Sequence, residues 1–364
     1  MPSALRHQIG QLLIVGFNGH QIPPELRSLA RSFGLGGVIL FARNVAEPEQ
    51  VAEVAFDAAR LVPDLPAWVS VDQEGGRVAR LKSPFTEWPP MATLGRSGDT
   101  RLAGRFAKAL AAELKSVGIT LDYAPVLDIH TNPKNPVIGD RALAEKAEDV
   151  ARLGAAVVQA LQSEGIAACG KHFPGHGDTS TDSHFELPLV EHPPDRLRAV
   201  EFLPFKAAID AGVATIMTAH VLVPSLDEQR PATLSRRIVH DLLRDELKFE
   251  GVILSDDLEM KAVAAEYAVP DSAVMAIQAG CDGILICSGD HDTQGAALEA
   301  LVHAVEEDRL PLARVEDALK RQRRAKERFL ASPVAARPAG GRALREALGR
   351  DDHRAIAEEM ARFL

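Results

Sequence analysis

Eight apolar runs of strand length, separated by helix-like stretches, constrain the fold of this 364-residue chain more than any other feature. The runs cover residues 11–17, 37–41, 67–71, 120–127, 166–169, 214–218, 252–254 and 283–287. A continuous apolar run is typical of a strand buried on both faces, as in a parallel sheet covered by helices. Eight such strands are the number that closes a barrel, so the sequence predicts an α/β fold of the TIM-type (β/α)8 class.

Helical periodicity lies between these runs. Leu26, Ala30 and Phe33 recur at the i, i+4, i+7 spacing of one helix face, and Gly34 marks the end of that helix. Similar patterns predict further helices near residues 51–58, 100–116, 147–163, 195–211, 236–247, 270–279 and 298–305.

The main alternative fold is an open, doubly wound sheet. Such a sheet would place a glycine-rich phosphate turn after its first strand, and the segment Gly16-Phe-Asn-Gly19 lacks that spacing. Periodicity breaks after residue 330. We therefore expect one catalytic barrel over residues 1–330, followed over residues 331–364 by a linker and a C-terminal helical tail.

Charge and cysteine content narrow the classes of function and compartment. The formal net charge of −10 argues against non-specific binding to nucleic acid or to anionic membranes. Cys169, Cys281 and Cys287 form no CxxC pair, which suggests reduced thiols in a cytosol. The apolar segment at residues 12–15 is too short for a signal peptide, and no run approaches the roughly 18 residues of a membrane span. We expect a cytoplasmic monomer with no nucleic-acid or membrane partner.

Titratable residues follow many of the predicted strands directly. They are Asp72, Asp128, Lys171 with His172, His220 and Asp256. The carboxyl ends of parallel barrel strands meet at one mouth, and catalytic groups in such barrels come from several of those ends. The pattern therefore predicts an active site at this mouth.

The densest group of these residues lies in a loop rich in glycine. Within fourteen residues the loop carries Lys171, His172, His176, Asp178, Asp182 and His184. Residues two apart in an extended segment point the same way, so Asp182 can bond one nitrogen of His184 and leave the other for proton transfer. In the alternative interpretation, Asp182 only caps backbone amides of a surface turn.

A pair of acids, Asp256 and Asp257, follows the seventh predicted strand. A carboxylate at this position would project into a desolvated mouth and can act as a nucleophile. Neighbouring strand residues face opposite ways, so we expect one of the two to face the substrate and the other to cap the next helix. In the alternative interpretation, both acids cap the helix that follows. A nucleophilic carboxylate and a separate proton donor are the two catalytic groups of retaining glycoside hydrolases, in which they lie ~5 Å apart.

Several stretches also resemble a known family in its own order, over about residues 8–330. They are VDQEGGRV at 71–78, YAPVLD at 123–128, GDR at 139–141, KHFPGHG at 171–177, DSH at 182–184, MTAH at 217–220 and ILSDD at 253–257. The sequence resembles the β-N-acetylglucosaminidases of glycoside hydrolase family 3, of the single-domain bacterial NagZ type.

The resemblance implies a role for each matching residue. Asp256 would be the nucleophile, His184 the acid/base and Asp182 its orienting partner. The residues that would hold N-acetylglucosamine in the −1 subsite are Asp72, Arg80, Arg141, Lys171 and His172. The resemblance also implies cleavage of N-acetylglucosaminyl-anhydromuramyl peptides in peptidoglycan recycling, with no cofactor and no metal.

Three other functions remain open from the sequence. His172, His176, His184, Asp178 and Asp182 could bind a divalent metal, although no two histidines have the HxH or HExxH spacing. A catalytically silent sugar-binding barrel is a second alternative. A phosphorylase is a third, because a histidine would not repel phosphate as a carboxylate does. Glu74 could lie near the sugar, but we assign it to loop structure. We also assign His176 and Asp178 to loop structure, and His220 either to the pocket or to a buried partner.

Overall fold

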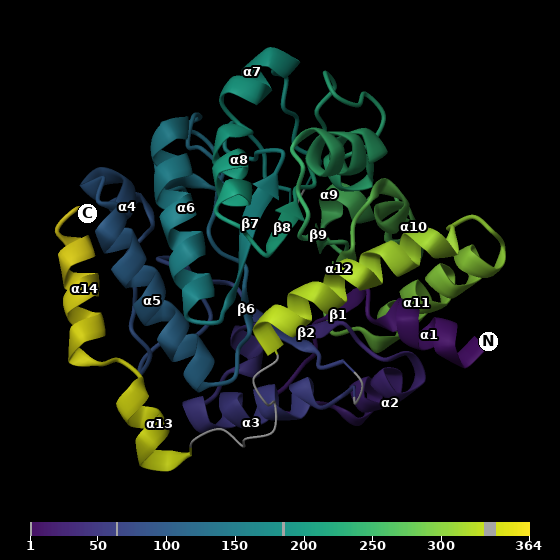
Figure 1. The fold of residues 1–364 in the computed structure, drawn as a ribbon, viewed down its shortest axis with the longest axis horizontal. Helices are drawn as coiled ribbons and strands as arrows, with labels where there is room; N and C mark the ends of the chain where they lie inside the picture. Colours follow the sequence, from purple (N-terminus) through teal and green to yellow (C-terminus); the bar gives the residue numbers. More distant parts are fainter. Residues whose placement is uncertain (1, 63–64, 184–185, 331–339) are drawn as a thin grey trace.

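The computed structural model describes residues 2–62, 65–183, 186–330 and 340–364. Eight parallel strands form a closed barrel in the order β1-β10-β9-β8-β7-β6-β3-β2 (Figure 1). The strands are β1 (Leu13–Val15), β2 (Gly37–Leu40), β3 (Trp68–Val71), β6 (Leu121–Asp122), β7 (Ala167–Phe173), β8 (Thr215–Thr218), β9 (Val252–Asp257) and β10 (Gly283–Ile286). Each lies within or overlaps one of the predicted apolar runs, and the predicted (β/α)8 class is confirmed.

Helices surround the barrel (Figure 1). They are α1 (Pro2–Gly10), α2 (Pro24–Phe33), α3 (Pro48–Ala59), α4 (Ala92–Ser97), α5 (Thr100–Ser116), α6 (Ala147–Ser163), α7 (Pro194–Ala199), α8 (Leu203–Asp210), the π-helix η4 (Arg237–Glu246), α9 (Lys261–Ala264), α10 (Val269–Ala279), α11 (His291–Glu306) and α12 (Leu312–Leu330). Short 3₁₀ turns are η1 (Ala42–Asn44), η2 (Gly139–Arg141) and η3 (Ala232–Leu234). Among the described residues, no helix combines the length and apolar character needed to span a membrane.

The helix expected over residues 195–211 is wrong as a single element. The chain breaks between α7 and α8, and Pro204 lies in the first turn of α8. Proline has no amide hydrogen and clashes with the carbonyl four residues earlier, so it fits a helix start better than a helix interior.

A short hairpin not expected from the sequence follows β3 and forms one wall of the mouth. Its strands are β4 (Gln73–Gly75) and β5 (Val78–Ala79). The buried Gln73 side chain accepts from the backbone amides of Arg80 and Leu81 at 2.8 and 3.0 Å. This contact closes the hairpin and places Asp72 and Arg80 near each other.

The C-terminal tail forms two helices, α13 (Gly341–Ala347) and α14 (Asp351–Ala361), which pack beside α3, α4 and α5 (Figure 1). The expected linker falls largely on residues 331–339, which lie outside the described residues. Leu344 and Met360 are buried in the main hydrophobic core, so the tail is part of the packed unit.

Glu113 on α5 ties this tail to the barrel. Its buried carboxylate accepts from Thr86 N at 2.8 Å and Thr86 Oγ1 at 2.6 Å, and from Gly349 N at 3.0 Å. His353 Nδ1 lies 2.8 Å from the same carboxylate. One side chain therefore joins three segments that are far apart in sequence.

Candidate active site

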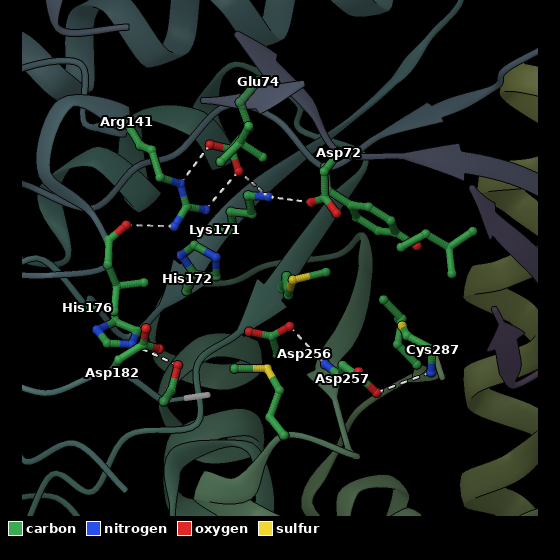
Figure 2. Close-up of a pocket in the computed structure, with 18 of the residues that line it drawn as sticks. Asp72, Glu74, Arg141, Lys171, His172, His176, Asp182, Asp256, Asp257 and Cys287 are labelled. Carbon is green, nitrogen blue, oxygen red and sulfur yellow. Dashed lines mark hydrogen bonds and ion pairs between the residues drawn. The ribbon is translucent and has the colours of Figure 1, made fainter. Parts of the chain in front are cut away.

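One cavity at the carboxyl ends of the strands contains the predicted site residues that the structure describes (Figure 2). These are Asp72, Arg80, Arg141, Lys171, His172, Asp182 and Asp256. Apolar residues also line the cavity, including Ile39, Phe41, Tyr123, Met217 and Leu285. His184, the predicted acid/base, lies outside the described residues. A polar cavity with an apolar floor suits a small ligand that carries hydroxyl groups and one apolar face.

A buried lysine forms the centre of the polar wall. Lys171, from β7, places its Nζ 2.8 Å from Asp72 Oδ1 and 2.6 Å from Glu74 Oε1. Arg80 lies 3.4 Å from the other oxygen of Asp72. Burial alone would lower the pKa of Lys171, but Asp72 and Glu74 outweigh burial and raise it. The ammonium is therefore charged and fixed in place.

Glu74 lines the cavity, so its preferred assignment to loop structure is wrong and the alternative, a place near the site, is correct. Both of its oxygens accept from Arg141, at 2.8 Å to Nε and 2.8 Å to Nη2. Burial alone would raise the pKa of Glu74, but Arg141 and Lys171 outweigh it and hold the pKa below its usual range. Glu74 is therefore ionised and orients both cations.

A second carboxylate, Asp128, organises the start of the loop after β7. Its Oδ2 lies 2.6 Å from His172 Nδ1, and its Oδ1 accepts from the backbone amide of His176 at 2.6 Å. Burial favours the neutral acid, yet the two histidines outweigh it and lower the pKa of Asp128. These bonds fix the ring plane of His172 at the cavity wall.

Asp256 lies near the end of β9 and lines the cavity. Its Oδ1 accepts from the backbone amide of Asp257 at 2.8 Å. Burial alone would raise the pKa of Asp256, but His220 and His172 outweigh burial and hold it below its usual range. The carboxylate is ionised at neutral pH, as a nucleophile requires.

Both Asp256 and Asp257 contribute to the cavity lining, but the Asp257 carboxylate is directed toward the backbone amide of Cys287 and away from Asp256 (Figure 2). Leu254 pairs with Gly283 and Asp257 with Leu285, so three steps along β9 match two along β10. The extra residue is a bulge, which breaks the strict alternation of side chains.

Asp257 does not cap the next helix. Its Oδ1 accepts from the backbone amides of Glu259 at 3.1 Å and Cys287 at 3.2 Å, whereas α9 begins only at Lys261. Burial raises the pKa of Asp257 to about 7. Two adjacent acids in one cavity therefore differ in protonation near neutral pH.

Two remaining histidines have buried partners. His220 Nδ1 lies 2.8 Å from Thr233 Oγ1, and its Nε2 lies 2.9 Å from the carbonyl oxygen of Asp257. His176 bonds Thr179 through one ring nitrogen and Ser183 through the other. Both ring nitrogens of His176 are thus engaged within the loop, which disfavours the metal-binding alternative for this residue.

The described part of the chain does hold a cluster with the spacing of metal ligands, but it lies elsewhere. His240, Asp241 and Asp245 gather on the surface of η4, away from the cavity residues. His240 Nδ1 already lies 3.1 Å from Asp241 Oδ1, so a hydrogen bond on the helix surface accounts for this cluster.

The barrel mouth combines an ionised carboxylate at a strand end with a wall of fixed charged groups, and this arrangement fits the hydrolysis of a sugar. The comparisons with known proteins define the class as a glycoside hydrolase. Residues 4–325 match the model of the glycosyl hydrolase family 3 N-terminal domain, and the chain belongs to this family.

Three relatives show the extent of the similarity. A β-hexosaminidase of Nitrosomonas eutropha is 42% identical over 275 residues, which are 73% of this chain and 77% of the relative. The structure of a family 3 β-N-acetylglucosaminidase from Paenibacillus sp. matches with a TM-score of 0.94 and 41% identity, over 99% of this chain and 68% of that one. NagZ from Neisseria gonorrhoeae in complex with N-trifluoroacetyl-D-glucosamine matches with a TM-score of 0.76 and 30% identity, over 97% of both chains.

Proposed function

We propose that this glycoside hydrolase is a retaining β-N-acetylglucosaminidase that removes terminal N-acetylglucosamine from cell-wall muropeptides. The observation that carries the proposal is the ionised Asp256 at the end of β9, in the same cavity as Asp182 and the Lys171 cluster. The names of the relatives, and the N-acetylated glucosamine in the Neisseria structure, support the choice of sugar.

In the proposed reaction, Asp256 attacks the anomeric carbon through an oxocarbenium-like transition state, and the bond to the leaving oxygen breaks. His184 donates a proton to that oxygen, with Asp182 orienting its imidazole. The sugar is then held as a glycosyl ester on Asp256. The neutral His184 takes a proton from water, which attacks the anomeric carbon and releases the sugar with its configuration retained.

The charged wall holds the sugar during both steps. Asp72, Arg80, Arg141, Lys171 and His172 present donors and acceptors to the same cavity. Because Glu74 and Asp128 fix several of these side chains before substrate arrives, little reorganisation is needed on binding. Fixed donors and acceptors of this kind suit sugar hydroxyls and an acetamido group.

The biological substrate in this proposal is an N-acetylglucosaminyl-anhydromuramyl peptide of peptidoglycan recycling, handled in the cytoplasm. Support for it comes from the NagZ likeness across 97% of both chains. Arg77 and Pro136 also line the cavity, and we assign the muramyl portion to their side.

A proton NMR time course with an aryl β-N-acetylglucosaminide, with and without phosphate, tests the proposal. We expect the β-anomer of N-acetylglucosamine to appear first, at the same rate in both samples. Early release of the α-anomer would overturn retention, and formation of a sugar 1-phosphate would establish a phosphorylase. Asp256→Ala serves as the control that should abolish turnover.

A further inference from the structure

A buried histidine with no role in the proposed chemistry, His176, contacts Ser183. His176 is 2% exposed, and its two ring nitrogens lie 2.7 Å from Thr179 Oγ1 and 3.1 Å from Ser183 Oγ. Ser183 is also 2% exposed and stands between Asp182 and His184 in the chain. His176 therefore contacts the residue that joins the two proposed members of the acid/base pair.

The hydroxyls of Thr179 and Ser183 satisfy both nitrogens of a neutral imidazole. Burial lowers the pKa of His176 to about 4, so the ring is neutral, with one donor and one acceptor nitrogen. A hydroxyl can either donate or accept, so Thr179 Oγ1 and Ser183 Oγ can pair with either tautomer of the ring.

Ser183 is held from a second side as well. Its carbonyl oxygen accepts from the backbone amide of Ala262 in α9, at 3.2 Å. With the hydroxyl fixed by His176 and the carbonyl fixed by α9, the backbone of Ser183 has a defined direction. Ser183 is bonded directly to Asp182, whose side chain lines the cavity (Figure 2).

His176 is itself held by the loop between β6 and η2. The buried Asn135 donates from Nδ2 to the carbonyl oxygens of His176 at 2.8 Å and Gly177 at 3.2 Å. Its Oδ1 accepts from the backbone amides of Val137 and Ile138 at 2.9 and 2.7 Å. These bonds anchor the base of the loop, so His176 is a rigid support for Ser183.

We propose that His176 is a positioning residue. Through its contact with Ser183, it holds Asp182 in the position from which Asp182 orients the proton donor. This inference rests on the proposed function, in which Asp182 orients the proton donor His184. It assigns no bond-making step to His176.

The test compares Ser183→Ala, His176→Asn and the double variant on two aryl β-N-acetylglucosaminides. One carries a nitrophenol, which departs with little protonation, and the other an alkylphenol, which needs a proton. kcat/KM reports formation of the glycosyl-enzyme. For each single variant we expect kcat/KM on the alkylphenyl substrate to fall about fivefold to tenfold, which corresponds to the loss of one hydrogen bond. On the nitrophenyl substrate kcat/KM should change little.

Two further results are expected if His176 and Ser183 act through one contact. The loss of kcat/KM in the double variant should not exceed the larger of the two single-variant losses, because the first substitution already removes the contact between His176 and Ser183. His176→Gln, whose amide reaches the position of Nε2, should restore part of the activity that His176→Asn lacks. Equal losses on both substrates, or additive losses in the double variant, would overturn the inference.

His184→Ala separates failure of this inference from failure of the proposed function. It should lose far more activity on the alkylphenyl than on the nitrophenyl substrate. If it does not discriminate, the proposed proton donor is wrong. If it does discriminate but Ser183→Ala and His176→Asn do not, only the positioning role of His176 is wrong.

Discussion

Replacing Glu74 with glutamine should destabilise the folded protein by removing the charge between Lys171 and Arg141. The Glu74 side chain is 1% exposed, and those of Lys171 and Arg141 are 2% and 10% exposed. The glutamine amide would also direct hydrogens at one of the two cations. Asp72 would remain as the partner of Lys171, at 2.8 Å.

The expected magnitude follows from burial. Removing one partner of a buried ion pair leaves an uncompensated charge and destabilises by ~3–5 kcal/mol, and the remaining Asp72 places Glu74→Gln near the lower end, at about 3 kcal/mol. Displacement of Arg141 and Lys171 from the sugar site should lower kcat/KM by about a hundredfold. Denaturant unfolding at pH 7 and steady-state kinetics measure the two effects.

A matched control is available on the surface. Arg6 and Glu299 form a similar two-bond pair at 2.6 and 2.8 Å, but their side chains are 33% and 40% exposed. Glu299→Gln should change the free energy of unfolding by less than about 1 kcal/mol and leave activity unchanged. Equal stability losses in Glu74→Gln and Glu299→Gln would refute the argument from burial.

The pH dependence of the Glu74 effect has a defined sign. The pKa of Glu74 is lower in the folded protein than its usual 4.5, so its stabilisation is complete above pH 4.5 and is lost as the pH falls below that value. The stability difference between the wild type and Glu74→Gln should therefore narrow on acidification. A difference that stays constant from pH 7 to pH 3 would contradict the proposed ion pairing.

Three further predictions concern groups outside the proposed reaction steps. Burial raises the pKa of Asp257 to about 7, so the folded state binds more protons than the unfolded state between pH 4 and pH 7. The free energy of unfolding of the wild type should therefore fall over this range relative to that of Asp257→Asn, and an equal pH dependence of the two free energies would refute this. Burial lowers the pKa of Lys326 to about 7, so stability should rise from pH 7 to pH 10 in the wild type but not in Lys326→Met, as pH-dependent unfolding would show. His353→Ala removes a partner of Glu113 and should make the tail helices α13 and α14 more sensitive to limited proteolysis; an unchanged cleavage pattern would show that the remaining contacts suffice.

The sequence predicted the barrel strands well because strands buried on both faces are continuous apolar runs. The strand expected over residues 120–127 shows the limit of this signal, since β6 covers only Leu121–Asp122. Pro125 lies in that run and has no amide hydrogen to donate to a neighbouring strand. The hairpin of β4 and β5 was missed because it is held by the Gln73 side chain rather than by an apolar pattern.

The cavity residues were predicted where they lie at the end of a strand or directly after it, as Asp256 and Asp72 do. The preferred assignment of Glu74 to loop structure was wrong because its importance depends on Lys171 and Arg141, which are 97 and 67 positions away in the sequence and reach it only in the folded barrel. The capping role expected for one of the two acids was wrong for Asp257, because the bulge in the β9–β10 pairing and the bond to Cys287 have no signal in the local sequence.

Identification of the covalent intermediate tests the proposed mechanism most directly. Enzyme quenched rapidly in acid during turnover of an aryl β-N-acetylglucosaminide would be digested, and the peptide that contains residues 255–258 would be sequenced by mass spectrometry. We predict one N-acetylglucosaminyl group on Asp256, and none on this peptide in Asp256→Ala. A sugar attached to Asp257 or to another residue would contradict the assignment of Asp256 as the nucleophile.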